Sequence, residues 1–493
     1  MDKLIKVIDF FVIKFWIVFC IIIFCGALVV KAKYHMADYP YFTWNSVIDI
    51  ILLVFIVMCY YFLHKYAQKI ENHMNYFVLW IVFGIIGILY VLLVPLKPFS
   101  DMAYVTEGAM FFSRGDIDGI LASEYLQMTI KNIKVSMFYG ILGVFLPKNI
   151  LSFRVINVFL YLSTAYLLSK VGKNFDYKYP KIIFILVSTY LPLLMYCNHV
   201  YFDLPVLFLC TAAVYFYTKE KNWKNMIIMS IVLGLACSLR VLAFLFVVAI
   251  AIDYVFCFKK ELFLAHCKKM LMLCVFVIVV WAIPKGCDEI VDNHFRLEES
   301  TDGSIWSLFW MGINEEEFGF MHNEIADGPK YFSDFYNLLI SRNMEQNVKL
   351  FGRKIFWEWS QGTYQAQRYG FGPDATIATD KFEYETPVTR YLMYDEQRGR
   401  QFINSFCRAQ YLALFFFMIL GMRNMDDKTR AGYRMLIYLM FGTFLVLIFY
   451  ELKSRYVMHC MIPMVMLAVR GLERSKEAIR TRNLNRCKTR RYP

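Results

Sequence analysis

Charged residues are scarce in this chain of 493 amino acids. Asp, Glu, Lys and Arg make up 19% of it, whereas soluble globular domains contain about 25%. Hydrophobic residues account for 59% of the chain and aromatic residues for 18%. A soluble fold of this composition would leave much apolar surface in water, which opposes folding. The shortage of charge excludes an ordinary soluble domain and favours a membrane protein.

The sequence also lacks the short motifs that mark several enzyme classes. It contains no HExxH, Walker A, GxGxxG or GxSxG motif in a suitable context, which argues against a zinc protease, an ATP-driven protein, a dinucleotide enzyme and a serine hydrolase. Its 13 cysteines are scattered, without a CxxC pair, so neither a disulfide framework nor a zinc site is predicted. The N-terminal apolar segment has no small-residue cleavage site, and we expect it to remain as the first span.

The net charge of +13 would suggest a nucleic-acid partner in a soluble protein. Here Lys and Arg lie mainly in short loops and at the C-terminus, where they act as orientation signals. We therefore expect no nucleic acid as a partner. The basic loops 218–225 and 423–434 are predicted to be cytoplasmic.

Apolar runs long enough to cross a bilayer recur along the whole chain. They fall at 10–30, 47–63, 76–96, 150–170, 181–198, 201–218, 225–258, 268–285, 404–422, 432–451 and 455–472, and the run 225–258 allows two short crossings joined at Ser238–Arg240. The shorter run 133–147 fits a tilted or re-entrant helix. We predict an all-α polytopic membrane protein of about 12–13 transmembrane helices with an extracytoplasmic loop domain.

The spans divide the chain into four expected regions. These are an N-terminal transmembrane module, an extracytoplasmic domain, the C-terminal transmembrane helices and a basic cytoplasmic tail, at 1–285, 286–403, 404–472 and 473–493. The first external loop, 97–132, is expected to carry the catalytic groups. The protein would lie in the cell membrane as a multi-pass protein, with its active site facing the extracytoplasmic side.

Three polar residues stand at the ends of apolar runs on the same predicted outer face: Asp101, Asp203 and Arg240. A carboxylate at the edge of the bilayer can act as a base or bind a divalent ion. Each residue also has a structural alternative. The two aspartates can cap the helices that follow them, and Arg240 can extend toward the lipid headgroups.

Further cations lie on the outer face in this topology, against the usual inward bias of positive charge. Lys131 and Lys134 open the short 133–147 run, and Arg455 and Tyr456 open the last span. Lys and Arg bind phosphate well. This placement suggests a lipid phosphate as ligand.

These residues, in this order, resemble the GT-C superfamily of polytopic glycosyltransferases, specifically the protein O-mannosyltransferase and lipid A aminoarabinose transferase type. The residues that carry the resemblance are Asp101, Tyr104, Glu107, Gly115, Asp116, Lys134, Asp203, Leu204, Pro205, Arg240, Arg455, Tyr456 and Pro463. The resemblance covers most of the membrane part but not residues 287–401. Many members have two adjacent acids at the first motif, whereas Asp101 stands between Ser100 and Met102, which leaves metal use open.

The resemblance implies transfer of a sugar from a polyprenyl-phosphate donor to a glycan, lipid or protein acceptor, with inversion at the anomeric carbon. It implies that Asp101, with Glu107, is catalytic, as a base or as a ligand of Mg²⁺ or Mn²⁺. It implies that the donor phosphate is bound by Lys134, Arg240, Arg455 and Tyr456. Asp203 and Tyr104 would bind substrate.

Three other functions fit parts of the pattern. A lipid-linked oligosaccharide flippase or other transporter would place polar residues near the membrane midplane, whereas here they gather on one face. A polysaccharide polymerase or ligase would use an Arg/His pair in the external loop, for which Arg368 and His322 are the candidates. An assembly scaffold would consume no donor.

Overall fold

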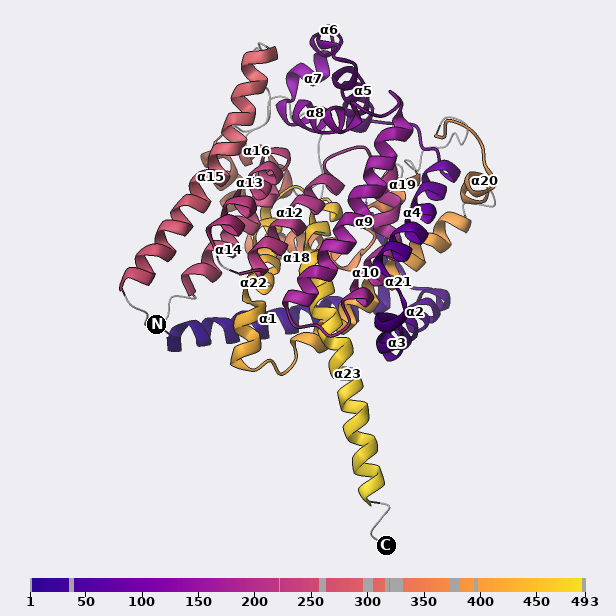
Figure 1. The fold of residues 1–493 in the computed structure, drawn as a ribbon, viewed down its shortest axis with the longest axis vertical. Helices are drawn as coiled ribbons and strands as arrows, with labels where there is room; N and C mark the ends of the chain where they lie inside the picture. The colour runs from indigo at the N-terminus through magenta and orange to yellow at the C-terminus, as the bar shows by residue number, and fades with distance from the viewer. Residues whose placement is uncertain are drawn as a thin grey trace.

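The computed structural model describes residues 2–34, 40–220, 222–256, 263–295, 305–314, 319, 331–371, 381–393 and 398–489. These residues are almost wholly helical (Figure 1). The strands described are the antiparallel pair β1 (Val30–Tyr34) and β2 (Pro40–Trp44), in which Ala32 pairs with Phe42. The predicted all-α class is confirmed.

Eight helices of the described chain are long and apolar enough to cross a membrane. They are α1 (Asp2–Val29), α2 (Val47–Lys65), α4 (Tyr76–Leu93), α9 (Ile150–Asn174), α15 (Phe263–Phe295), α21 (Arg398–Met422), α22 (Asp427–Phe449) and α23 (Met461–Thr489), the last together with the turn η5 (Ser454–Cys460). A ninth span results if α10 (Pro180–Ser188) is joined, across a 55° bend, to α11 (Leu191–Met195) and η1 (Tyr196–Asn198). The chain is a polytopic helical membrane protein.

The remaining predicted spans form shorter helices. They are α12 (Asp203–Thr218), α13 (Trp223–Leu239) and the unit made of η2 (Val241–Ala243) and α14 (Phe244–Phe256). Each is shorter than the roughly 20 residues that a full crossing needs. The expected 12–13 spans are thus met only in part. The chain breaks at Asn198–Asp203 and at Arg240, where the backbone becomes extended and the helices end.

A layer of four helices precedes α9. It contains α5 (Asp101–Arg114), α6 (Ile117–Leu121), α7 (Glu124–Met128) and α8 (Ile130–Gly143). Figure 1 shows this layer at the top of the view, with α8 lying across the bundle. Gly140 permits close contact between α8 and α5, because a Cβ there would clash with the Cβ atom of Phe112. With 14 residues, α8 is too short to cross a bilayer alone.

The segment 286–403 is the one expected to form an extracytoplasmic domain. Its described residues do not form a unit separate from the helical bundle. Helix α15 runs past residue 285, and the later helices α16 (Ile305–Gly312), α17 (Phe332–Ser341), α18 (Met344–Ser360), α19 (Ala366–Phe371) and α20 (Pro387–Met393) precede α21. Trp359 of α18 packs edge-on against Trp16 of α1, with ring centroids 5.1 Å apart. The described part of this segment shows no distinct domain: Trp359 is buried against the bundle, whereas Tyr331 and Phe332 are exposed.

The segment after residue 380 holds the loop that leads into α5. Leu96 and Phe382 form an antiparallel bridge, and the backbone N–H of Lys97 donates to the Lys381 carbonyl at 2.8 Å. The buried Arg154 of α9 binds Glu383 at 2.9 Å and also donates to the Leu96 carbonyl. These contacts fix the start of α5.

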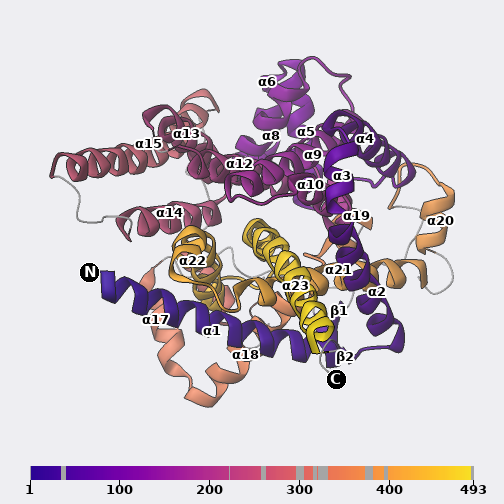
Figure 2. The same ribbon diagram turned by 60° about the horizontal axis from the view of Figure 1, so that its bottom comes forward.

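A buried ion cluster ties together α1, α14 and α22. The Arg434 Nη2 and Nε atoms donate to Asp9 at 2.9 and 3.0 Å, and its Nη1 donates to Asp253 at 3.3 Å. The Tyr438 hydroxyl donates a hydrogen bond to Asp9, and the Tyr217 hydroxyl donates one to Asp253. In the second view these helices lie on the opposite side of the bundle from α6 (Figure 2).

Candidate functional site

Asp101 begins α5, and its carboxylate is held by two tyrosines. The Tyr125 hydroxyl of α7 donates to Oδ1 at 2.6 Å, and the Tyr201 hydroxyl donates to Oδ2 at 3.2 Å. The two oxygens thus accept from hydroxyls rather than from backbone N–H groups at the helix start. This arrangement differs from the capping alternative.

The environment of Asp101 keeps its carboxyl ionised. Burial raises the pKa, but the hydrogen bond from Tyr125 and the nearby cations Arg455 and Lys453 outweigh burial, so the pKa lies below its usual value. Burial, together with the carboxylate of Asp101, raises the pKa of Tyr125. At neutral pH the site therefore contains a carboxylate and a protonated phenol.

The residue before Asp101 is strained. Ser100 has φ 52° and ψ −146° and makes no side-chain cap to the helix. This region suits glycine rather than a residue with a Cβ. Asp101 thus directly follows a sharp, strained turn of the backbone at Ser100.

Ser100→Gly is expected to stabilise the protein by about 1 kcal/mol, because relief of strain exceeds the added entropy of the unfolded chain. The gain should appear in the midpoint of thermal unfolding in detergent. Ser100→Ala, which keeps the Cβ and loses no cap, should show no such gain. Destabilisation by glycine would show that the turn is unstrained.

A second acidic centre lies at the start of α12. Asp203 is 1% exposed, and its Oδ1 accepts from Arg240 Nη1 at 2.9 Å. Its Oδ2 lies 3.3 Å from His199 Nδ1 and 3.8 Å from Arg455 Nη1. Burial lowers the pKa of His199, so this imidazole is neutral at neutral pH although Asp203 favours its charged form. With His199 neutral, the charged groups here are the guanidinium groups of Arg240 and Arg455 and the one carboxylate of Asp203.

Aromatic rings surround the two arginines. The Arg240 guanidinium lies 4.7 Å from the ring centroid of Phe202 and 4.9 Å from that of Tyr456. The Arg455 guanidinium lies 4.9 Å from the ring of Tyr369 and 5.7 Å from that of Tyr201. Stacking of this kind holds a guanidinium in place without neutralising its charge.

Both arginines keep unused hydrogen-bond donors. Arg455 is 6% exposed, yet its buried Nε atom has no hydrogen-bond partner in the part of the chain that is described. The same holds for the buried Nη2 atom of Arg240. A buried donor without a partner is costly. The pair is therefore suited to an anionic ligand.

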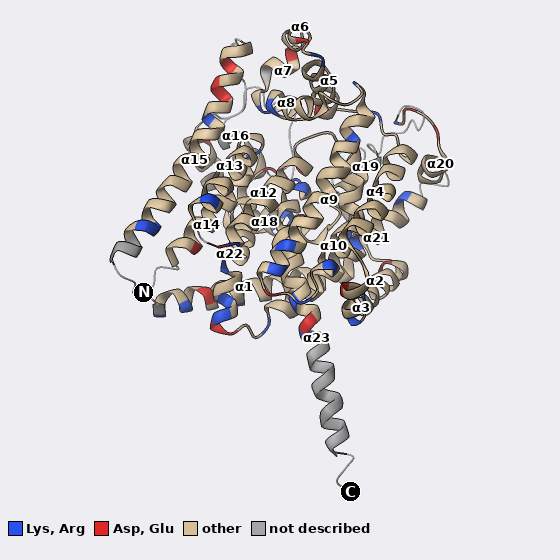
Figure 3. Ribbon diagram, viewed as in Figure 1, with Lys and Arg blue, Asp and Glu red and all other residues tan. Residues whose placement is uncertain are grey.

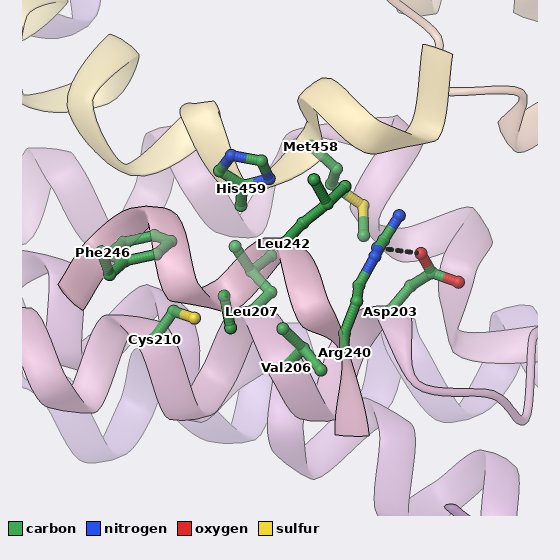
Figure 4. A pocket seen from close by; sticks show the side chains of 10 residues that line it. Asp203, Val206, Leu207, Cys210, Arg240, Leu242, Phe246, Met458 and His459 are labelled. Carbon is green, nitrogen blue, oxygen red and sulfur yellow. Dashed lines mark hydrogen bonds and ion pairs between the residues drawn. The ribbon is translucent and has the colours of Figure 1, made fainter. Parts of the chain in front are cut away.

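Asp203 and Arg240 border a small pocket, which Figure 4 shows with the Asp203–Arg240 contact dashed. Leu242, Phe246 and His459 line its other sides. His459 contacts the hydroxyl of Thr443 at 2.8 Å and serves as a packing residue. The pocket has about 10 Å³ of space, which suits a single water rather than a sugar.

The loop before the last span supplies a further ion pair. Lys453 Nζ lies 2.5 Å from Glu451 Oε1, and the Tyr456 hydroxyl donates to Glu451 Oε2 at 2.5 Å. Lys453 is also close enough to lower the pKa of Asp101. The hydroxyl of Tyr456, expected to bind phosphate, is thus bound to Glu451, while its ring faces Arg240.

The structure brings Asp101, Asp203, Arg240 and Arg455 into one region, but Lys134 lies apart. Lys134 Nζ binds Asp288 of α15 at 2.6 Å. Asn132, two residues earlier on α8, faces the Asp101 tyrosines, and residues two apart point to opposite sides of a helix. The contacts of Lys134 therefore lead away from this region.

The other two predicted residues line the outer side of α5. Tyr104 is 41% exposed and stacks on Tyr125 with ring centroids 4.1 Å apart, and Glu107 is exposed. Tyr104, three residues after Asp101, lies on the helix face that carries Asp101, whereas Glu107 lies about 120° around the helix from it. Arg368, considered for a ligase, lies 5.7 Å from the ring of Phe99, whereas His322 is outside the described residues.

Within the described part of the chain, the residues around Asp101 do not fit Mg²⁺ or Mn²⁺. Among the described residues, no group of three or more His, Cys, Asp or Glu side chains could hold a metal ion. Asp101 instead faces tyrosine hydroxyls and two cations, whose charge opposes a bound metal.

No protein-family model, curated protein or solved structure matches this chain. Its class, a polytopic helical membrane protein, follows from its own helices.

Proposed function

We propose that this protein is a membrane glycosyltransferase that moves a sugar from a polyprenyl-phosphate donor to a hydroxyl acceptor on the outer face of the membrane. The observation that carries the proposal is the position of Tyr201 between a carboxylate and a cation. Its hydroxyl binds Asp101, and its ring lies 5.7 Å from the Arg455 guanidinium. A group that can take a proton thus lies close to a group that can bind a phosphate.

The donor phosphate is assigned to Arg455 and Arg240. Together with Asp203 they carry one excess positive charge, and each has a buried donor atom without a partner. A lipid phosphate is confined to the bilayer edge, where such cations bind it well. Lys453 is a better placed third cation than Lys134, because it acts on Asp101 electrostatically.

The reaction requires a base and a stabilised leaving group. The acceptor hydroxyl gives its proton to Asp101 as its oxygen forms the new bond to the anomeric carbon. The bond from that carbon to the phosphate oxygen breaks, and its electron pair leaves with the phosphate. Arg455 and Arg240 stabilise the added negative charge. Direct displacement on this path inverts the anomeric carbon.

The distribution of charge supports the proposed orientation. Figure 3 shows Asp and Glu on the upper end of α15 and around α6 and α7, while Lys and Arg are frequent at the other end, near α1 and α22. Cytoplasmic ends of membrane proteins are enriched in Lys and Arg. The Asp101 end would then face away from the cytoplasm. On that side the active site can reach an acceptor outside the cell membrane.

The proposal is tested with purified protein in liposomes that contain radiolabelled polyprenyl-phosphate sugars, with and without a chelator. Glycan, glycolipid and peptide acceptors are offered in separate reactions. Transfer to an acceptor supports the proposal. Movement of labelled lipid between leaflets without any transfer would favour the flippase alternative.

Arg455→Gln is expected to raise the donor KM by about 10- to 100-fold, because a charge-assisted hydrogen bond is lost. The acceptor KM should change little. The matched control is Arg423→Gln, at an exposed arginine at the end of α21, which should leave both constants unchanged. An unaltered donor KM in Arg455→Gln would remove this residue from phosphate binding.

A further inference from the structure

Asp101 belongs to a ring of four polar side chains, each within hydrogen-bond distance of the next. Tyr125 and Tyr201 each donate to one oxygen of Asp101. Asn132, which is fully buried on α8, joins the two tyrosines on the other side. Its Nδ2 atom donates to the Tyr125 hydroxyl at 3.1 Å, and its Oδ1 atom lies 3.1 Å from the Tyr201 hydroxyl.

The number of protons in this ring leaves the Tyr201 hydroxyl with two alternative hydrogen bonds. The Tyr125 oxygen accepts from Asn132, so its own proton points to Asp101. The Tyr201 hydroxyl lies within reach of two acceptors, Asp101 Oδ2 at 3.2 Å and Asn132 Oδ1 at 3.1 Å. A hydroxyl has one proton and can serve only one of them at a time.

We propose that Tyr201 and Asn132 form a hydrogen-bond switch that follows the protonation state of Asp101. While Asp101 is ionised, the Tyr201 proton points to it and stabilises the carboxylate. Once Asp101 has taken up a proton, its new O–H group donates to the Tyr201 oxygen, and the Tyr201 proton turns to Asn132 Oδ1. In the ionised state Asn132 Oδ1 gives up this donor to the carboxylate, and in the protonated state both acceptors are served, because Asp101 then brings a proton of its own. Only one hydroxyl rotates between the two states. Tyr201 and Asn132 are positioning residues in this scheme.

The switch rests on the proposed function only in its purpose, which is to let Asp101 accept and release the acceptor's proton. The same ring would respond to any proton that reaches Asp101. Other groups that face this carboxylate are Arg455 and Lys453, which favour the ionised form, while Glu107 of the same helix is exposed. The two cations lower the pKa of Asp101, and the hydrogen bonds of the ring lower it further.

The two partners of the switch have opposite effects on the Asp101 pKa. Tyr201→Phe removes a donor to the carboxylate, so the pKa of Asp101 should rise by about one unit. Asn132→Leu removes the alternative acceptor, so the Tyr201 proton stays on Asp101 and the pKa should not rise. A merely structural role would move both variants in the same direction. The carboxylate contributes stability above its ordinary pKa, and this is lost as pH falls through the folded pKa; in Tyr201→Phe the loss begins at higher pH.

The experiment is an infrared titration of the full-length protein, in which the Asp101 band is identified by its absence in Asp101→Asn. The control is Tyr161→Phe, which removes another buried hydroxyl that donates to a backbone carbonyl, that of Ser188. We expect an upward shift in Tyr201→Phe, none upward in Asn132→Leu and none in the control. A wild-type midpoint in Tyr201→Phe, or equal upward shifts in both variants, would overturn the switch.

The titration needs no substrate, so its failure and that of the proposed function are distinguishable. If no donor is consumed but the midpoints move as expected, the switch stands and the transferase proposal falls. If sugar is transferred but the midpoints do not move, only the switch falls. Where transfer occurs, the acidic limb of the kcat/KM profile should shift in Tyr201→Phe by the same amount as the infrared midpoint.

Discussion

Asp101→Asn is expected to lower kcat for sugar transfer by about a hundred- to ten-thousand-fold, the usual contribution of a general base. Asparagine has nearly the same shape, and its carbonyl oxygen can still accept from Tyr125. Its amide nitrogen can donate to the Tyr201 oxygen. The variant should therefore fold as the wild type does while lacking the proton acceptor. The measurement is the rate of transfer at saturating donor, alongside thermal unfolding in detergent.

Asp118→Asn provides the control for this change. Asp118 is an exposed acid on α6, in the same helical layer, and its substitution should leave transfer unchanged. Turnover at the wild-type rate in Asp101→Asn would exclude Asp101 as the base.

Arg434→Met is expected to cost about 3–5 kcal/mol of stability, because it leaves the carboxylates of Asp9 and Asp253 buried without their cation. Arg434 is the guanidinium that holds α1 and α14 to α22. The loss should appear as a lower midpoint in denaturant unfolding of the protein in detergent. No substrate is needed for this measurement.

The control is the triple variant in which Arg434→Met is combined with Asp9→Asn and Asp253→Asn. It removes all three charges together, so most of the lost stability should return. A single variant within about 0.5 kcal/mol of the wild type, the range usual for surface changes, would show that water reaches this cluster.

Local chain features sufficed to predict the position of Asp101. The sequence shows an acid directly after a long apolar run, and the structure places it at the start of α5. Its partners could not be predicted, because Tyr125 and Tyr201 lie 24 and 100 residues away and the chain has 34 tyrosines. No spacing distinguishes them from tyrosines that only pack.

The ion pairs show the same limit. Arg240 follows α13 and has no acid close to it in the sequence, and its partner Asp203 lies 37 residues earlier, at the start of α12. Lys134 looked like Arg240 in the sequence, a cation at the start of a short apolar run. Its binding to Asp288 depends on the path of α15, which extends beyond the predicted end of its span. The sequence pattern reveals which residues stand at span ends but not which neighbour each one faces.

The order of synthesis has a consequence for this site. Its groups come from residues 101 to 455, and the loop before Asp101 is held by Glu383 through Arg154. A ribosome must therefore deliver the chain as far as residue 455 before Asp101 meets Arg455, the last cation of the site. Until then a nascent chain has no assembled site, and a product cut short before Arg455 would have none at all.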